Sequence, residues 1–242
     1  MRAFNVRQER FCGVAEGSPS SAEISRPRVV YVIGGGCFKD GTLPPDARMR
    51  VSAAIQLLLE SRRAGQVCRI VLLGGTFRSG FNDAVQEMAL LKRAYWNRYS
   101  LNENEVRLIQ EGHSTAHQVN LIRQDLAGHD SDALVVANHW QLGYTRELCL
   151  ARKLNARYEA VEETLVRRRP AYSRIVKAFE AMPCVRASRR RAGVQSSIVK
   201  YLGSLGFVLL IFLWKTMGTY MPPRPKNLFC ALPRSSSAEF SR

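Results

Sequence analysis

The chain has 242 residues, of which 46% are hydrophobic and 9% aromatic, so it is long enough for one well-packed domain with appended segments, whereas two full domains would be crowded. Its net charge of +16 is uneven, because residues 1–150 carry 18 basic and 15 acidic side chains and residues 151–242 carry 18 and 5. The basic character therefore belongs to the C-terminal part of the chain. It suits an anionic membrane surface, nucleic acid or phosphorylated material, and the membrane is the preferred interpretation.

Six cysteines lie at positions 12, 37, 68, 149, 184 and 230, with no CxxC pair and no histidine at zinc-finger spacing. This pattern disfavours a metal site made of cysteines and is typical of small buried residues in a reducing compartment. A structural disulfide is the less favoured alternative. Residues 1–27 contain no apolar run typical of a secretory signal and are predicted to be a disordered leader.

The clearest strand is a run of apolar, β-branched residues at 28–33, which stops at three glycines. Thr42 is the expected N-cap of the next helix, and two prolines suit its first turn. Apolar residues then recur at helical spacing from Val51 to Leu59, which predicts an amphipathic helix of about five turns.

The same unit of strand, turn and helix then recurs. Strands are expected at 68–73, 106–109 and 132–137, each followed by a helical pattern, and residues 158–161 are a candidate fifth strand. Strands that alternate with helices through short connections predict a mostly parallel sheet with right-handed crossovers. The expected fold is therefore a Rossmann-like three-layer α/β sandwich over residues 28–182.

Glycine or polar residues follow each expected strand. In parallel α/β sheets ligands bind beyond the carboxyl ends of the strands, near helix N-termini, so these residues predict one ligand-binding edge. The glycines would let the backbone approach a phosphate or carboxylate, and Arg50 would clamp an anionic group. The alternative for the glycines is ordinary turn chemistry, and for Arg50 it is a surface charge or an ion pair with Asp46. The candidate ligand-binding residues are Gly34, Gly35, Gly36, Arg50, Gly74, Gly75, Asp83, Ser114, Asn120 and Asn138.

Three residues are candidates for acid–base catalysis: Glu111, His117 and His139. Glu111 and His117 flank a junction between strand and helix, so Ser114 can cap the helix while the other two face the same space. A histidine beside a carboxylate can titrate near neutral pH. His139 directly follows a strand, although a lone histidine is more often structural. No G-x-S-x-G motif is present, which disfavours a hydrolase of that kind.

The pattern changes beyond Pro170, where arginine runs precede an apolar stretch. Residues 183–197 are predicted to be a basic linker. Residues 198–220 are a candidate transmembrane or membrane-associated helix, because residues 201–214 carry no charge and the flanking lysines can snorkel. An apolar helix docked on the sheet or on a partner subunit is the alternative. If the helix spans, its basic flank places the α/β domain on the cytoplasmic side. Residues 221–242 are expected to be a disordered tail.

Four segments, taken in order, resemble motifs of the YdcF/SanA/ElyC-like family, and the resemblance covers about residues 28–155. The first motif is VIGGG at 32–36 with Arg50 in the following helix. The second is Leu73-Gly74-Gly75 with Asp83 opening a helix, and its first position lacks the hydroxyl found in the family. The third is E-x-x-S-x-x-T-x-x-N, matched here by Glu111, Ser114, His117 in place of the threonine, and Asn120.

The fourth motif reads VVANHWQLGYTRE and departs from the family at three positions. Ala137 replaces a threonine, Gln141 a histidine and Tyr144 an arginine. The family implies an α/β fold, a link to envelope biogenesis in some members and S-adenosylmethionine binding proposed for one of them, but no settled reaction.

The expected function is that of a membrane-associated protein that binds a small phosphorylated or nucleotide-type ligand, with S-adenosylmethionine as the cofactor that the resemblance suggests. The protein would act as an enzyme linked to the cell envelope. A catalytically degenerate binding module at the membrane is the first alternative, because the departures fall in the site. A nucleic-acid binder that uses the basic C-terminal region is the second, and it is disfavoured because no reader motif accompanies the charge. The oligomeric state does not follow from the sequence.

Overall fold

The computed structural model describes residues 28–76, 80–127 and 131–217. The predicted leader and the predicted disordered tail lie outside these ranges, as do the last three residues of the candidate membrane helix.

Five parallel strands form one sheet in the order β3-β2-β1-β4-β5. All four pairings between neighbouring strands are parallel. The expected parallel α/β sheet is therefore confirmed, and only the fifth strand differs from its predicted range, by one residue. The strands are β1 (Arg28–Ile33), β2 (Cys68–Leu73), β3 (Val106–Ile109), β4 (Asp132–Ala137) and β5 (Arg157–Ala160).

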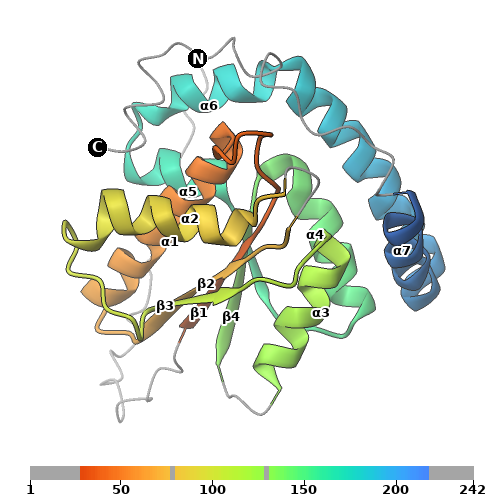
Figure 1. The fold of residues 1–242 in the computed structure, drawn as a ribbon, viewed down its shortest axis with the longest axis horizontal. Helices are drawn as coiled ribbons and strands as arrows, with labels where there is room; N and C mark the ends of the chain where they lie inside the picture. Colours follow the sequence, from red (N-terminus) through yellow and green to blue (C-terminus); the bar gives the residue numbers. More distant parts are fainter. Residues whose placement is uncertain (1–27, 77–79, 128–130, 218–242) are drawn as a thin grey trace, which may run out of the picture.

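Helices cover both faces of this sheet, as a Rossmann-like sandwich requires (Figure 1). α1, α2 and α5 pack on one face, and α3 and α4 on the other, where α7 packs against α4 from outside. The helices are α1 (Pro45–Arg63), α2 (Asp83–Leu91), the π-helical turn η1 (Lys92–Trp96), α3 (Thr115–Leu126), α4 (His139–Ala151), α5 (Val161–Arg168), α6 (Tyr172–Ala181) and α7 (Pro183–Met217).

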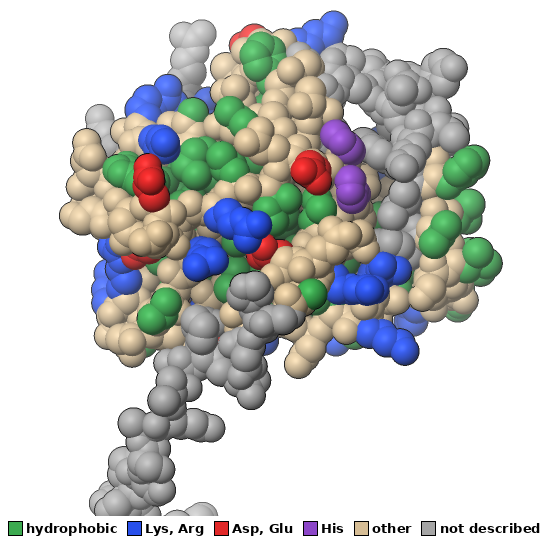
Figure 2. Space-filling view, turned by 60° about the horizontal axis from the view of Figure 1, so that its bottom comes forward, with side chains coloured by type: hydrophobic (Ala, Val, Ile, Leu, Met, Phe, Trp, Pro, Cys, Tyr) green, Lys and Arg blue, Asp and Glu red, His purple; other side chains and the backbone are tan. Residues whose placement is uncertain are grey.

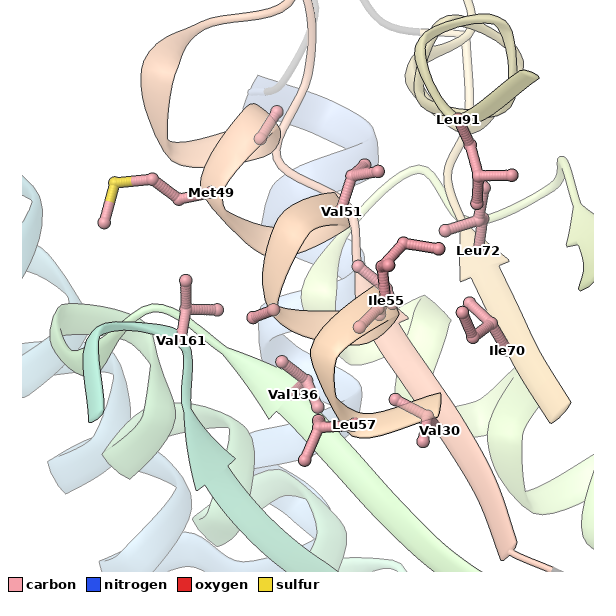
Figure 3. Packing of buried hydrophobic residues seen from close by; sticks show 14 of the residues in the cluster. Val30, Met49, Val51, Ile55, Leu57, Ile70, Leu72, Leu91, Val136 and Val161 are labelled. Atoms are coloured by element: carbon pink, nitrogen blue, oxygen red, sulfur yellow. The ribbon is translucent and has the colours of Figure 1, made fainter. Parts of the chain in front are cut away.

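The hydrophobic core consists of two clusters separated by the sheet. Alternate residues of a strand point to opposite faces, so Val30 and Val32 of β1 pack under α1 while Tyr31 and Ile33 pack under α3 and α4. Figure 3 shows the first cluster, in which Ile55 of α1 lies among side chains of the sheet. Because both faces are buried, the strands read in the sequence as continuous apolar runs.

The start of α1 differs from the sequence-based expectation. Thr42 is not its N-cap, because the Thr42 hydroxyl donates a hydrogen bond to Asp40 Oδ1 (2.7 Å) inside the preceding loop. Pro44 is the N-cap residue, and Pro45 is the first helical residue, where a proline loses no intrahelical hydrogen bond.

The C-terminal region is helical from residue 183, so the stretch expected as a basic linker forms the first part of α7. Ala192 and Val199 are buried there against the second core cluster, which explains why this basic segment folds as a helix on the domain. Gly203 has non-helical backbone angles (φ 53°, ψ −129°) and divides α7 into two segments. Within the described ranges, no helix combines the length and apolar character needed to cross a bilayer. Membrane attachment stays a prediction.

Candidate functional site

The candidate residues follow the carboxyl ends of β1, β2, β3 and β4, which lie along one edge of the sheet because all strands are parallel. We call this edge the rim. In the sheet, β2 and β3 lie on one side of β1, and β4 and β5 lie on its other side. The strand order therefore reverses between β1 and β4, which is the position where open α/β sheets bind their ligands.

Asp83, the first residue of α2, connects the turns after β1 and β2. Its carboxylate is fully buried and accepts hydrogen bonds from the backbone N–H groups of Gly36 and Gly75, both at 2.8 Å. Burial raises the pKa of Asp83, while the hydrogen bonds from Gly36 and Gly75 and the charge of Arg50 act in the opposite direction. Asp83 therefore occupies backbone donors that the sequence had suggested for a ligand.

The glycines of the rim are required by the close packing of the protein itself. A Cβ atom at Gly74 would lie 2.1 Å from Asp83 Oδ1, and one at Gly34 would lie 2.3 Å from the Leu73 carbonyl oxygen. At Gly35 a Cβ would lie 2.6 Å from Arg50 Nη2. The structure therefore supports a packing role for these glycines, and their contact with a ligand stays a prediction.

Arg50 bridges the two sides of the point where the strand order reverses. Its guanidinium is fully buried, and Nη1 donates to Asn138 Oδ1 at 2.6 Å and to Asp46 Oδ2 at 3.4 Å. Nη2 lies 3.9 Å from Glu87 Oε1, which is an ion-pair distance but too long for a hydrogen bond. Nε and Nη2 have no hydrogen-bond partner among the described residues.

Glu87 belongs to this cluster but was not predicted from the sequence. Its side chain is fully buried, and neither carboxyl oxygen has a hydrogen-bond partner within the part of the chain that the structure describes. Burial raises the pKa of Glu87 well above its ordinary value; Arg50 lowers it, and Asp83 and Asp46 raise it. Asp83, Glu87 and Leu91 are spaced by four residues, so all three lie on the inward face of α2. This spacing is the one feature of the sequence from which a buried position of Glu87 could have been predicted.

Glu162, in the first turn of α5, is a second rim residue that the sequence did not reveal. Its carboxylate accepts hydrogen bonds from Asn138 Nδ2 (3.0 Å) and from the backbone N–H of His139 (2.7 Å). Asn138 thus links Glu162 to Arg50. Burial raises the pKa of Glu162, and the hydrogen bond from Asn138 opposes that shift.

The side chain of His139 points outward from this network toward the C-terminal helices. Its Nδ1 lies 3.2 Å from Glu180 Oε1 of α6, and Arg189 Nη2 of α7 lies 3.2 Å from the same oxygen. The imidazole is 54% exposed, so it lies at the surface of the domain. This contact between His139 and Glu180 connects α4 to α6.

The residues after β3 form a more exposed part of the rim. Glu111 is exposed, and Ser114 caps α3 as predicted, accepting a hydrogen bond from the backbone N–H of His117 at 3.1 Å. The His117 ring lies 5.7 Å from the ring of His113. Gln118 connects this part to β1, since its side-chain oxygen accepts from the Gly34 N–H at 3.0 Å.

The hydrogen bond of Asn120 lies away from the rim. Its side-chain oxygen accepts from Arg152 Nη2 (2.8 Å), which lies at the end of α4 opposite to His139. This contact joins α3 to α4 and explains Asn120 by packing between the two helices.

All three positions that depart from the family motif hold buried side chains, and two of these side chains are polar. Gln141 donates a hydrogen bond to Thr115 Oγ1 (2.9 Å) and so joins the first turns of α4 and α3. Tyr144 is 7% exposed, and burial raises the pKa of its hydroxyl. Both side chains therefore have a structural role where the family motif has a histidine and an arginine.

Nucleophilic and metal chemistry gain little support at the rim. Cys37 directly follows the glycine turn, but burial and the neighbouring Asp83 and Glu87 raise the pKa of its thiol to about 12, so the reactive thiolate is disfavoured. In the described part of the chain, no group of three or more histidine, cysteine or acidic side chains is arranged to hold a metal ion. The rim holds one buried guanidinium, that of Arg50, the buried carboxyl groups of Asp83, Glu87 and Glu162, and the more exposed side chains of Glu111, His117 and His139.

Comparisons of the chain with family models, with curated proteins and with solved structures gave no match. Membership in the YdcF/SanA/ElyC-like family therefore rests on the four sequence motifs and stays a prediction.

Proposed function

We propose that the α/β domain binds a small phosphorylated or nucleotide-type ligand at the rim, between the ends of β1 and β4. One observation carries this proposal: Arg50 and Glu87 are fully buried there, yet two guanidinium nitrogens and both carboxyl oxygens have no hydrogen-bond partner among the described residues. Buried polar groups in folded proteins are nearly always paired, so this unused capacity marks a place where a polar ligand would gain hydrogen bonds.

The charges around Arg50 are compatible with an anionic group. Because burial raises the pKa of Glu87, its neutral acid form is favoured, and in that form the carboxyl is a hydrogen-bond donor that does not repel an anion. The guanidinium supplies further N–H donors whose geometry matches phosphate or carboxylate. S-adenosylmethionine is one candidate, suggested by the family resemblance, and it also carries a carboxylate.

Catalysis is a narrower proposal that concerns Glu111, His117 and His139. His117 and His139 are exposed or half-buried side chains at helix starts on the rim, so they are accessible for acid–base exchange with a bound ligand. The alternative function, a binding module without catalysis, is favoured by the buried structural roles of Gln141 and Tyr144.

The test is ligand-dependent thermal stability of the full chain with S-adenosylmethionine, ATP and inorganic phosphate as separate probes. A ligand present at a hundred times its Kd is expected to add about 2.7 kcal/mol to the free energy of unfolding. Arg50→Gln should abolish this gain. Arg69→Gln, an exposed arginine of β2, is the matched control and should keep it.

Glu87→Gln separates binding from folding, because the amide imitates the neutral acid and should retain the fold with an altered ligand response. The proposal is contradicted if none of the three probes stabilises the wild type, or if Arg50→Gln and the wild type gain equally.

A further inference from the structure

The second segment of α7 turns an apolar face outward. Leu205, Val208 and Leu209 follow the helical spacing of a buried face, yet their exposed fractions are 67%, 58% and 38%. Tyr201, just before the break at Gly203, is 82% exposed. We call these four residues the apolar stripe. Hydrophobic side chains line the edge of the molecule formed by α7 in Figure 2, and an exposed apolar patch of this kind marks an interaction surface.

The first segment of α7 continues this surface with positive charge. Its inner side is fixed by Ala192 and Val199, which are buried against the second core cluster. The opposite side of the helix presents exposed residues at helical spacing, which are Arg186, Arg190, Val194 and Tyr201. Cationic and apolar side chains therefore follow one another along one outward side.

The two segments do not form one straight rod. A Cβ atom at Gly206 would lie 2.7 Å from the carbonyl oxygen of Ile198, eight residues earlier, so the second segment turns back against the first after Gly203. In a continuous helix those two positions would be about 12 Å apart along the axis. The bend keeps the apolar stripe beside the folded domain, which suits a helix that lies along a surface.

The charge of this region selects among the partners that could cover the stripe. Between Glu180 and Glu239 the sequence contains nine basic residues and no acidic one. A second copy of the same surface would bring like charges together, and the chain's own residues 218–238 are also basic. A layer of anionic lipid headgroups supplies both the opposite charge and an apolar interior.

We propose that the outward side of α7 binds the surface of a membrane that contains anionic lipids, with the apolar stripe inserted at the level of the headgroups and the arginines of the first segment above it. The helix lies in the plane of the interface, and the rim of the α/β domain stays in water. This inference does not depend on the ligand proposed for the rim.

The experiment is cosedimentation of the full chain with vesicles of phosphatidylcholine, with and without phosphatidylglycerol, in the absence of other ligands. The wild type is expected to bind the anionic vesicles roughly tenfold more strongly, and high salt should release it. Leu205→Glu/Val208→Glu should weaken binding by roughly tenfold or more, since it places charge in the inserted face. Val67→Glu is the matched control, because Val67 is 72% exposed and lies outside α7.

Arg186→Gln/Arg190→Gln tests the charge and should reduce binding to the anionic vesicles alone, by roughly tenfold. Equal binding to both kinds of vesicle, or a Leu205→Glu/Val208→Glu variant that binds like the wild type, overturns the proposal. Resistance to both salt and alkaline carbonate overturns it in favour of a spanning helix. Sedimentation velocity without lipid tests for dimers of the chain. If the wild type forms dimers, if Leu205→Glu/Val208→Glu separates them, and if the vesicles stay unbound, the proposal is overturned in favour of a second copy of the chain as the partner of the apolar stripe.

Discussion

At the scale of single residues, the rim depends on buried carboxyl groups whose charge is costly. Asp83, Glu87 and Glu162 are all buried, and burial is the largest cause of the raised pKa of each. Asp83 and Glu162 are compensated by backbone or amide donors, whereas Glu87 has only the Arg50 guanidinium, 3.9 Å from its Oε1. Glu87 is therefore the group whose protonation most directly couples the rim to pH.

The stability of the fold should fall as pH rises above the ordinary glutamate pKa of 4.5. Because the pKa of Glu87 is higher in the folded state, the folded chain holds a proton that the unfolded chain has lost. Its contribution is fully present below pH 4.5 and is lost as pH rises through the folded-state pKa, with a slope of up to about 1.4 kcal/mol per pH unit. Glu87→Gln should flatten the profile in urea unfolding at several pH values. Glu103→Gln, at an exposed position, should leave it unchanged.

Gly74→Ala should destabilise the protein by roughly 2–4 kcal/mol, because the added Cβ would lie 2.1 Å from Asp83 Oδ1 and force the carboxylate out of its place. Gly143→Ala is the control. Nothing lies within 4 Å of a Cβ at Gly143, in the middle of α4, so alanine there should add up to about 1 kcal/mol. Denaturation midpoints measure both, and an unchanged Gly74→Ala variant would contradict the packing role of the glycines.

The sequence predicted part of this site, and the limits have physical reasons. Arg50, Asp83 and Asn138 could be found because parallel strands place their following residues at one edge, and the structure joins them there. Glu87 and Glu162 were missed because a carboxylate inside a helix is usually solvated, and only the tertiary fold shows that these two point inward.

At the scale of elements, the strands were predictable nearly to the residue. β1, β2 and β4 are short β-branched runs with glycine or polar residues directly behind them, so pattern and turn chemistry agree. The helices α5 and α6 were not predicted, since they are short, with eight and ten residues, and lie on either side of Arg169 and Pro170. Their apolar residues Leu165 and Phe179 are buried in the first core cluster, where α5 packs against α1 and α6 against α5, and only the tertiary fold shows this packing.

Ser114→Ala should lower the free energy of unfolding by about 1 kcal/mol, because Ser114 Oγ accepts the N–H of His117 at the start of α3. Ser114→Asp retains an acceptor and should restore most of the loss. Chemical unfolding followed by circular dichroism measures the difference. Equal losses for alanine and aspartate would show that the cap is not the source of the effect.

At the scale of the whole molecule, α7 is part of the folded body even though its composition suggested a linker and a separate membrane segment. Its inner residues complete the layer outside α4 (Figure 1), while exposed arginines such as Arg186 and Arg190 lie on its outer side. The helix α7 accounts for only part of the uneven charge, because six of the 18 basic residues at 151–242 lie in it and eight lie at 152–177.

Val199→Asp should destabilise the whole domain by roughly 3 kcal/mol, since it places a charge among buried side chains of the second core cluster. Val194→Asp is the matched control: Val194 lies on the same helix and is 63% exposed. A single cooperative transition shifted only by Val199→Asp is the expected result in thermal unfolding. Two separate transitions, with the main one unmoved, would mean that α7 is independent of the domain.

The position of β1 at the centre of the sheet has a consequence for how the protein is made. β1 is synthesised first, but its partner β4 follows only about 100 residues later, as the pairing of Arg28 with Asp132 shows. Until that stretch has left the ribosome, one hydrogen-bonding edge of an almost wholly apolar strand is uncovered. Such an edge invites pairing with other nascent chains, so newly made protein depends on protection during translation more than an α-helical chain of equal length.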